Sequence, residues 1–456
     1  MSNAKQHATE IVLTLRHQGH QAYFAGGCVR DLLLNREPAD YDVATDAIPR
    51  EVMQIFPETY AVGEQFGVVL VPDLSSDERL PDSGIPLRSI GKAIEVATFR
   101  CDVAYSDGRH PDEVRFSQDP REDVQRRDFT INGMMLDPAT NNVLDFVGGR
   151  DDLKAGIVRA IGDPERRFTE DKLRMLRAVR FAARFDYQID PATMAAIQKL
   201  APKIHQVSCE RIREELTKML TEGHAKRAFQ LLDESCLLLE VLPEIAAMKG
   251  VEQPPQYHPE GDVFVHTLLL LDKLPAGTSK TLAWGALLHD VGKPPTFRVA
   301  PDRIRFDGHV EIGVAIGGEI LRRFRFSNDD TRQILALVEN HMRFMDTPRM
   351  KTSTLKRFFR LDKFDEHLAL HKMDCLAGSG HLDNWEFVRE RLQNMPEEAV
   401  RPRPLITGRE LIAAGYKPGA AFKQMLRAVE DAQLEGIIAT EEEALRLVKD
   451  RWQIRD

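Results

Sequence analysis

Apolar residues in the first part of the chain switch between helical and strand spacing. Ile11, Val12 and Leu15 recur among polar residues, which predicts an amphipathic helix over residues 1 to about 20. The run VRDLLL predicts a second helix directly after a glycine turn. Four segments have the β-branched or alternating pattern of strands, namely QAYFAGG, DYDVAT, GVVLV and IEVATF.

The pattern changes near Phe146-Val147-Gly148-Gly149, where strand signals fade and helical periodicity takes over. GRDDLKAG reads as a hinge into an all-helical remainder, because it is short, charged and closed by glycines. Three segments rich in proline, glycine and charge predict exposed loops: an insertion at 73–94, MKGVEQPPQYHPEGD and MPEEAVRPRPLITG. The sequence therefore predicts a mixed α/β head followed by stacked helical modules.

Composition narrows the class of protein. The 456 residues are enough for several domains, and the net charge of −9 argues against a general nucleic-acid coat while leaving room for a local basic face. The first residues lack the apolar core of a signal peptide, and no apolar run approaches the roughly 20 residues of a membrane span. We therefore expect no membrane association and a cytoplasmic protein.

The cysteines lie far apart and form no CxxC pair. This spacing argues against a disulfide framework or a thiolate zinc site and fits a reducing compartment. The residues concerned are Cys28, Cys101, Cys209, Cys236 and Cys375.

The segment GGCVRDLLLNREPADYDVAT combines a glycine turn, a fixed cation and two close carboxylates. Asp40 and Asp42 are two residues apart, so on a strand they point to the same face, where Mg²⁺ can offset their repulsion. Glycines let the backbone approach phosphate, and Arg30 supplies a cation. Each part also occurs by chance as an ordinary turn or an exposed strand, so the order of the parts carries the prediction of a phosphoryl-transfer site.

The run EDKLRMLRAVRFAARF places charge on one face of an expected helix. Between Arg166 and Arg184 there are seven basic residues against two acidic ones. The plain interpretation is a solvated, salt-bridged face. Four arginines at spacings of 3, 3 and 4 repel each other, however, so something anionic should face them. The face holds Asp171, Arg174, Arg177, Arg180 and Arg184.

A second group of candidate ligands lies in the helical remainder. A single histidine on an apolar helix is most often a core or capping residue. Four histidines and two aspartates in this order instead suit a divalent-metal site with room for two ions. They are His266, His289, Asp290, His309, His341 and Asp374.

Taken together, GGCVRD, DYDVAT, RRDFTINGM and EDKLRMLRAVRFAARF resemble the class II tRNA nucleotidyltransferase and bacterial poly(A) polymerase family, a branch of the polymerase β-like nucleotidyltransferases. The motifs stand in the family's order, and SCERIREEL and PLITGRELIAAGYKPGAAF extend the resemblance over nearly the whole chain. The combination is far more specific than any one motif.

The resemblance implies roles for residues of the head. Gly27 and Arg30 match the triphosphate-binding turn, and Asp40 and Asp42 match the pair that binds Mg²⁺. Glu95 stands where a third catalytic carboxylate is expected.

Further matches concern the nucleotide. Arg127, Asp128 and Asn132 fall in the motif that handles ribose and phosphate. Asp171 and Arg174 match the pair that reads the incoming base, and their donors and acceptors suit cytosine or adenine better than guanine or uracil. Two further nucleotide contacts are implied, at Arg177 and Arg180.

Two segments depart from or extend this pattern. SDGRHP resembles the family's flexible loop, thought to help the change from C to A addition, and is equally compatible with an ordinary β-turn. The 73–94 insertion departs from the compact family pattern and affects the expected geometry of the strand that carries Glu95.

The pattern H…HD…H…H…D resembles HD-domain metal phosphohydrolases, which some tRNA nucleotidyltransferases carry after the neck. The resemblance implies hydrolysis of phosphoesters, including 2′,3′-cyclic phosphates. Imidazole ligands favour a transition metal, so we expect Mn²⁺, Co²⁺ or Ni²⁺ there. The competing interpretation is that these histidines are core residues without an ion.

The expected fold is α+β, with a polymerase β-like head of mixed sheet and helices before an all-α neck, HD domain and tail. The expected boundaries are 1–150 for the head, 151–225 for the neck, 226–385 for the body with the HD domain and 386–456 for the tail.

The expected activity is addition of C, C and A to the tRNA acceptor end from CTP and ATP. Two alternatives use the same motifs: an A-adding enzyme and a poly(A) polymerase. A third alternative, of another class, is a protein that acts mainly as an HD phosphohydrolase on RNA ends. A pure RNA-binding scaffold is disfavoured by the acidic net charge. The sequence gives no oligomeric state.

Overall fold

The computed structural model describes residues 3–60, 67–73, 93–103, 113–256 and 258–452. The chain forms two compact units, Met1–Pro243 and Glu244–Asp456. The body of the predicted insertion and the SDGRHP segment lie outside the described residues. In the described part of the chain, no helix combines the length and apolar character that crossing a membrane requires.

The first unit is built on a six-stranded mixed sheet in the order β3-β4-β2-β1-β7-β8. β2 and β4 are parallel, and the other neighbours are antiparallel. All four predicted strands are present. The strands are β1 (Ala22–Ala25), β2 (Asp42–Thr45), β3 (Val68–Val71), β4 (Ile94–Thr98), β7 (Met134–Leu136) and β8 (Val143–Asp145).

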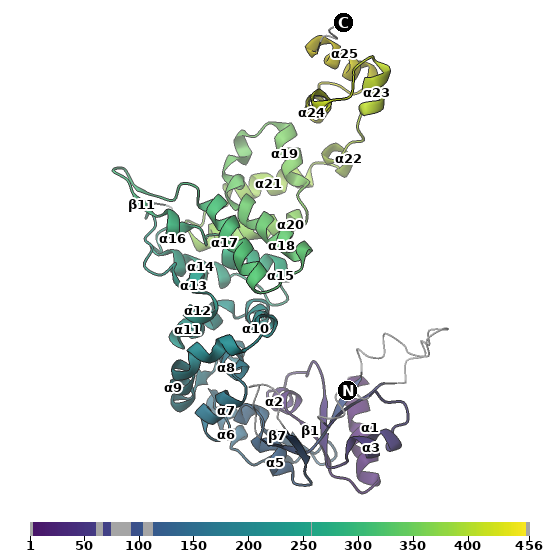
Figure 1. The fold of residues 1–456 in the computed structure, drawn as a ribbon, viewed down its shortest axis with the longest axis vertical. Coiled ribbons are helices and arrows are strands. Elements are labelled where there is room, and N and C mark those ends of the chain that lie inside the picture. Colours follow the sequence, from purple (N-terminus) through teal and green to yellow (C-terminus); the bar gives the residue numbers. More distant parts are fainter. Residues whose placement is uncertain (1–2, 61–66, 74–92, 104–112, 257, 453–456) are drawn as a thin grey trace. The chain divides into compact units, whose positions relative to one another are not determined.

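Helices cover this sheet. The predicted first helix is α1 (Asn3–His17), which buries Ile11, Val12 and Leu15. α1 contacts β1 and lies beside α3 (Pro49–Ile55), as Figure 1 shows. The remaining elements before the neck are α2 (Gly27–Leu33), α5 (Pro120–Gln125), α6 (Gly149–Ala155), the short 3-10 helix η2 (Thr130–Asn132), and a hairpin of β5 (Arg100–Val103) and β6 (Glu113–Phe116).

The neck helices complete the first unit. The run EDKLRMLRAVRFAARF was expected to form one helix, and this was wrong, because α7 (Pro164–Glu170) ends before α8 (Leu173–Phe185) begins. Asp171 has extended backbone, and its Oδ1 accepts the Leu173 N–H at 3.0 Å, which starts α8 in a new direction. The helices that follow are α9 (Pro191–Leu200), η3 (Ala201–Gln206), α10 (Cys209–Thr221), α11 (Ala225–Glu234) and α12 (Leu237–Val241).

The expected all-helical remainder is interrupted by two small strand pairs. β9 (Ile157–Val158) and β10 (Gln188–Ile189) run parallel in the first unit. β11 (Arg298–Val299) and β12 (Ile304–Arg305) form a hairpin in the second. Each pair is two residues long, which is too short for the periodicity of a sequence to reveal.

The second unit is otherwise helical. Its first part comprises α14 (Val263–Leu271), α15 (Lys280–Leu288), α16 (Lys293–Thr296), α17 (His309–Arg323), α18 (Asn328–Asn340), η4 (His341–Arg349), α19 (Thr352–Phe359) and α20 (Phe364–Ala377). α13 (Pro243–Ala246) stands at the boundary between the units.

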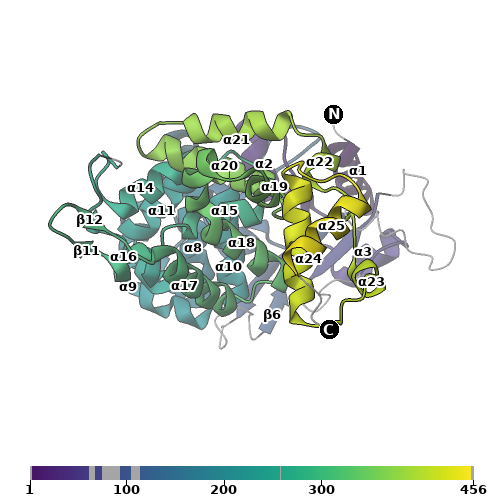
Figure 2. The same cartoon turned by 90° about the horizontal axis from the view of Figure 1, so that it is seen from above.

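The C-terminal helices have a small core of their own. Leu411, Val429 and Val448 are among its buried residues. Figure 2 shows α24 (Ala420–Leu434) beside α25 (Glu441–Arg451). Arg357 of α19 pairs with Glu430 of α24 at 2.7 Å, which ties this core to the rest of the unit. The remaining helices are α21 (Asp383–Gln393), α22 (Glu397–Val400) and α23 (Gly408–Ala413).

Candidate functional sites

Three carboxylates gather at the start of the parallel strand pair. Asp42 opens β2 and is the register partner of Glu95 on β4. Asp40 was expected on the same strand, and this was wrong: it lies two residues before β2 and is exposed. The strand nevertheless starts so soon after Asp40 that the two charges act on each other.

The pKa values record this crowding. Burial raises the pKa of Asp42 to about 7, and the charges of Glu95 and Asp40 add to the effect. Desolvation, followed by Asp40, raises the pKa of Glu95 as well. Carboxylates that resist ionisation next to one another fit a divalent cation with a preference for oxygen ligands, such as Mg²⁺.

The glycine turn lies directly against these carboxylates. Gly26 has φ of 75°, in the left-handed region that favours glycine. A Cβ at Gly26 would lie 3.0 Å from Nη1 of Arg127 and 3.6 Å from Oδ2 of Asp42. Gly27 begins α2, and a Cβ there would lie 3.5 Å from Nη2 of Arg30. The missing side chains thus leave space between two arginines and the Asp42 carboxylate.

Arg30 and Asn132 join the turn to the RRDFTING motif. Arg30 is 4% exposed, donates to Asn132 Oδ1 at 2.7 Å and lies 4.5 Å from the centre of the Phe185 ring. Asn132 in turn donates to Asp128 Oδ1 at 3.0 Å. Arg30 is therefore held mainly by the protein, with its edge at the cavity.

Asp128 links the head to the neck. Its Oδ2 accepts from Arg177 of α8 at 2.6 Å. Burial alone would raise the pKa of Asp128, but the Arg177 ion pair and the Asn132 hydrogen bond hold it at about 2. The carboxylate is therefore ionised at any physiological pH.

Asp171 and Arg174 face separate partners instead of each other. Arg211 of α10 donates to Asp171 Oδ2 at 2.8 Å. Arg174 donates to Glu170 Oε2 at 2.8 Å and to the carbonyl of Arg126 at 3.1 Å. Each member of the expected base-reading pair is thus held in place by another residue, Asp171 by Arg211 and Arg174 by Glu170.

The charge of the arginine face is also neutralised by carboxylates of the same chain. Besides the pairs above, Arg180 donates to Glu215 Oε2 at 2.7 Å, and Arg184 lies 3.7 Å from Glu222. The expected anion opposite these arginines is therefore supplied by carboxylates of this chain. The face is a network of ion pairs that borders the cavity.

These residues surround one cavity of about 540 Å³. The predicted residues that line it are Gly27, Arg30, Asp40, Asp42, Arg127, Asp128, Asn132, Asp171, Arg174, Arg177 and Arg180. Glu95 instead lines a smaller cavity of about 230 Å³, which Asp42 also lines.

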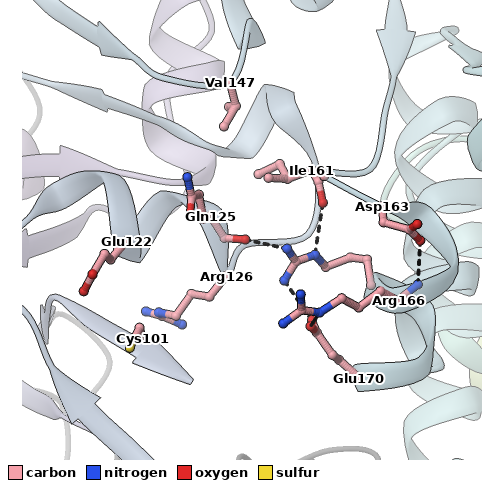
Figure 3. Close-up of a pocket in the computed structure, with 11 residues that line it drawn as sticks. Cys101, Glu122, Gln125, Arg126, Val147, Ile161, Asp163, Arg166 and Glu170 are labelled. Atoms are coloured by element: carbon pink, nitrogen blue, oxygen red, sulfur yellow. Dashed lines mark hydrogen bonds and ion pairs between the residues drawn. The ribbon is translucent and has the colours of Figure 1, made fainter. Parts of the chain in front are cut away.

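A third cavity of about 530 Å³ adjoins the head motifs (Figure 3). Arg126 lines all three cavities. Glu170, labelled in Figure 3, accepts from Arg167 at 2.8 Å as well as from Arg174. Arg174, which lines the 540 Å³ cavity, is therefore anchored by a carboxylate in the wall of a different cavity.

The six predicted ligands of the second unit converge on one place. His266 Nε2 lies 3.0 Å from Asp374 Oδ1, and His289 Nε2 lies 3.9 Å from the same oxygen. His341 Nε2 and His309 Nε2 lie 3.7 Å and 3.9 Å from Asp290 Oδ1. The ligand atoms form two groups of three, which suits two ions.

Three imidazoles of this cluster are oriented by a hydrogen bond between Nδ1 and a backbone carbonyl. Nδ1 faces the carbonyl of Ala286 in His289, of Phe306 in His309 and of Val338 in His341, at 2.8, 2.9 and 2.7 Å. A carbonyl only accepts, so Nδ1 carries the hydrogen and Nε2 presents a lone pair inward. This arrangement is that of metal-binding histidines.

Helix ends bring the ligands together. His289 follows the last residue of α15, His309 opens α17 and His341 follows α18. Gly292 permits the approach, because a Cβ there would clash with the carbonyl of His309. A cavity of about 370 Å³ adjoins the cluster, with basic and apolar walls that include Lys293, Arg305, Phe306, Met342 and Met345.

Sequence reasoning missed the residues that support these sites. In the first unit they are Asp123, Glu170, Arg211 and Glu215. In the second they are His258, Glu260 and Lys293. Lys293 had a usable signal, since it stands three residues after Asp290 and pairs with it at 2.7 Å. Asp123, Glu170 and Glu260 also lie within six positions of the groups they hold. Arg211 and Glu215 instead stand 40 and 35 positions from Asp171 and Arg180.

Family models match the chain in the same order as the structural parts. Residues 22–159 match the poly A polymerase head domain, residues 186–249 a probable RNA and SrmB-binding site of polymerase A, and residues 262–367 the HD domain.

Whole-length relatives agree with these matches. The chain is 32% identical to the CCA-adding enzyme of Geobacillus sp. (strain WCH70) over 98% of this chain and 96% of that protein. It is 30% identical to the CCA-adding enzyme of Leuconostoc mesenteroides subsp. mesenteroides over 96% and 94%. The crystal structure of the Bacillus stearothermophilus CCA-adding enzyme in complex with CTP is similar with a TM-score of 0.74 and 29% identity, covering 99% and 98% of the two chains. The protein therefore belongs to the CCA-adding enzymes, a family of nucleotidyltransferases.

Proposed function

We propose that this protein adds C, C and A to the acceptor end of tRNA from CTP and ATP, without a nucleic-acid template. The observation that carries the proposal is the 540 Å³ cavity that brings the Asp40 and Asp42 carboxylates, the glycine turn and the Asp171–Arg174 pair to one place. The whole-length similarity to CCA-adding enzymes, one of them solved with CTP, supports the same activity.

The residues divide the work as follows. The backbone at Gly26 and Gly27 approaches the triphosphate, and Arg127 neutralises its charge beside Asp42. Asp128, Asn132 and Arg177 hold the nucleotide's ribose end in a fixed network of one ion pair and one amide hydrogen bond.

Asp40 and Asp42 would hold the Mg²⁺, with Glu95 beside Asp42 as the third catalytic carboxylate. When bound, Mg²⁺ neutralises phosphate charge and favours ionisation of the RNA 3′-hydroxyl. Without it, the three carboxylates repel one another, as the raised pKa of Asp42 records.

Nucleotide choice rests with Asp171 and Arg174. A carboxylate accepts and a guanidinium donates, so together they complement the Watson–Crick edges of cytosine and adenine. Arg211 and Glu170 keep the two groups at fixed positions, which makes the selection a property of the protein.

The test uses tRNA that ends at the discriminator base. Purified protein is incubated with CTP, with ATP and with both, and the product ends are sequenced. Ordered C, C, A with both nucleotides is the expected result. A single A with ATP alone would indicate an A-adding enzyme, and long A tracts would indicate a poly(A) polymerase.

We further propose that the second unit is a metal-dependent phosphohydrolase. Two groups of three ligands with inward lone pairs support binding of Mn²⁺, Co²⁺ or Ni²⁺. The basic and apolar walls of the adjoining cavity suit a phosphoester of RNA ends, such as a 2′,3′-cyclic phosphate. A nucleotide-adding site and a phosphohydrolase site in one chain suit repair of damaged tRNA ends before C, C and A are added.

We propose the part boundaries 1–150, 151–225, 226–385 and 386–456 for head, neck, HD-containing body and tail. The dispersed, free cysteines support a reducing compartment, so we propose the cytoplasm.

A further inference from the structure

We infer that Glu260, in the loop before α14, is a positioning residue for His266 and strengthens metal binding in the second unit. The inference rests on the proposed metal centre. It concerns a residue outside the six ligands.

The geometry places the carboxylate on the outer nitrogen of the ring. Glu260 Oε1 lies 2.6 Å from His266 Nδ1, while Nε2 of the same ring lies 3.0 Å from Asp374 Oδ1. An acceptor at Nδ1 holds the hydrogen there, so Nε2 is left to bind an ion beside Asp374 and His289. The His266 side chain is 0% exposed, so no water competes for that hydrogen bond.

His266 differs from the other three histidines of the cluster in this respect. Their Nδ1 atoms face backbone carbonyls of Ala286, Phe306 and Val338. A carboxylate carries a full negative charge, which increases the electron-donating strength of the opposite nitrogen more than a carbonyl does. His266 is therefore built as the strongest imidazole ligand of the four.

The burial of Glu260 supports the same conclusion. Its side chain is 5% exposed, and its Oε2 is buried with no hydrogen-bond partner among the described residues. Oε1 also accepts from His258 Nδ1 at 2.9 Å, which fixes the carboxylate from the other side. A buried carboxylate is costly unless positive charge compensates it. A divalent ion on the far side of His266 supplies that charge.

A different arrangement uses the same atoms. His258, Glu260 and His266 offer ligand atoms within 4.8 Å of one another, which is close enough for a separate ion. That ion would need Nδ1 of His266 to bind metal while Nε2 serves the Asp374 group, so one ring would bridge two ions. The number of bound ions distinguishes the two arrangements.

The experiment compares Glu260→Gln with the full-length wild-type protein. Gln keeps the size of the side chain and one acceptor oxygen but removes the charge. Ni²⁺ is titrated by calorimetry in saturating Mg²⁺, which occupies the carboxylate site of the head. We expect Ni²⁺ affinity to fall about 10- to 100-fold with the number of ions unchanged. Glu252→Gln, an exposed change in the same loop, should leave it unaltered.

Nucleotide addition by the head and the melting temperature of metal-free protein report whether the variant is folded. Wild-type affinity in folded Glu260→Gln would overturn the inference while leaving the metal centre in place. Loss of one whole ion would replace it with the separate site at His258. A wild-type protein that binds no Ni²⁺ would overturn the proposed metal centre and this inference together.

Discussion

The two candidate metal sites solve the same electrostatic problem in opposite ways. In the head, carboxylates at the start of β2 and β4 crowd together, and burial and mutual repulsion raise the pKa of Asp42 to about 7. In the second unit, burial would raise the pKa of Asp374, but the hydrogen bond from His266 and the charges of His289 and His266 lower it instead. Without an ion, the Asp42 carboxylate of the head lacks enough positive charge nearby. The Asp374 carboxylate of the second unit has histidines beside it that can supply positive charge.

The difference follows from the residues that surround each set of ligands. The cation that lowers the pKa of Asp42 is Arg127, and its side chain is already engaged by Asp123 at 2.9 Å. In the second unit, His266 is a counter-charge to Asp374 while its ring is protonated, and it becomes a candidate ligand when Nε2 loses its hydrogen. A site that lacks compensation favours a hard ion with high charge density, whereas imidazole-rich sites favour transition metals. The two sites should therefore respond to different ions and to different mutations.

The largest expected effect comes from Asp42→Ala. Loss of this half-buried carboxylate should reduce nucleotide addition by about three orders of magnitude or more, since charge stabilisation at the transferred phosphate is lost. Initial rates of CTP and ATP incorporation into tRNA measure it, and Ni²⁺ binding by the second unit should be unchanged. A near-normal rate would contradict the head assignment.

The double change His289→Ala with Asp290→Ala should affect the second unit and spare the head. It removes one member of each ligand group, so hydrolysis of a 2′,3′-cyclic phosphate with Mn²⁺, Co²⁺ or Ni²⁺ should fall at least about 100-fold. Addition of nucleotides should remain largely intact. If the wild-type protein loaded with metal is inert towards phosphodiesters, phosphomonoesters and cyclic phosphates alike, the hydrolase proposal is wrong.

A smaller effect, on selection, is expected from Arg174→Ala. The incoming base would lose a charged hydrogen bond worth about 1.5–3 kcal/mol, which is roughly a 10- to 100-fold change in preference for CTP and ATP over UTP and GTP. Competition assays with all four nucleotides measure it. Arg166→Ala, an exposed change on the neighbouring α7, is the matched control, since its side chain is 82% exposed. Equal loss with every nucleotide would indicate a structural role for Arg174.

The strands, the first helix and the convergence of four histidines and two aspartates were predictable because local signals carried them. The spacing of Ile11, Val12 and Leu15 indicated a buried helix face. The adjacent His289 and Asp290 stand in a recognisable order with the other histidines. The break at Asp171 was not predictable from helical periodicity, because the hydrogen bond that the Asp171 carboxylate accepts from the Leu173 N–H overrides a pattern that continues through it.

Two of the supporting residues, Arg211 and Glu215, were hidden for a different reason. Arg211 meets Asp171 from another helix 40 positions away, and Glu215 meets Arg180 from 35 positions away. Nothing in the local sequence of either partner records the other. Such contacts depend on how helices pack, which periodicity does not specify.

The smallest expected effect tests the uncompensated charge of the head directly. An aspartate whose folded pKa is about 7, against about 3.8 for the ordinary side chain, favours the folded state only while protonated. Stability of the metal-free protein should therefore fall as pH rises from about 4 to about 7, and the full cost should remain above pH 7. Asp42→Asn cannot ionise. In EDTA at pH 8 it should melt roughly 5 °C higher than wild type, and the difference should shrink towards pH 4.

Glu58→Gln, an exposed change in the same unit, should show no such dependence on pH. Added Mg²⁺ should narrow the gap at pH 8, because the ion supplies to Asp42 the positive charge that the variant does without. An Asp42→Asn protein that is no more stable than wild type at pH 8 would show that the head carboxylates are compensated without metal. The two metal sites would then not differ in how their carboxylates are compensated, and the contrast drawn between them would be wrong.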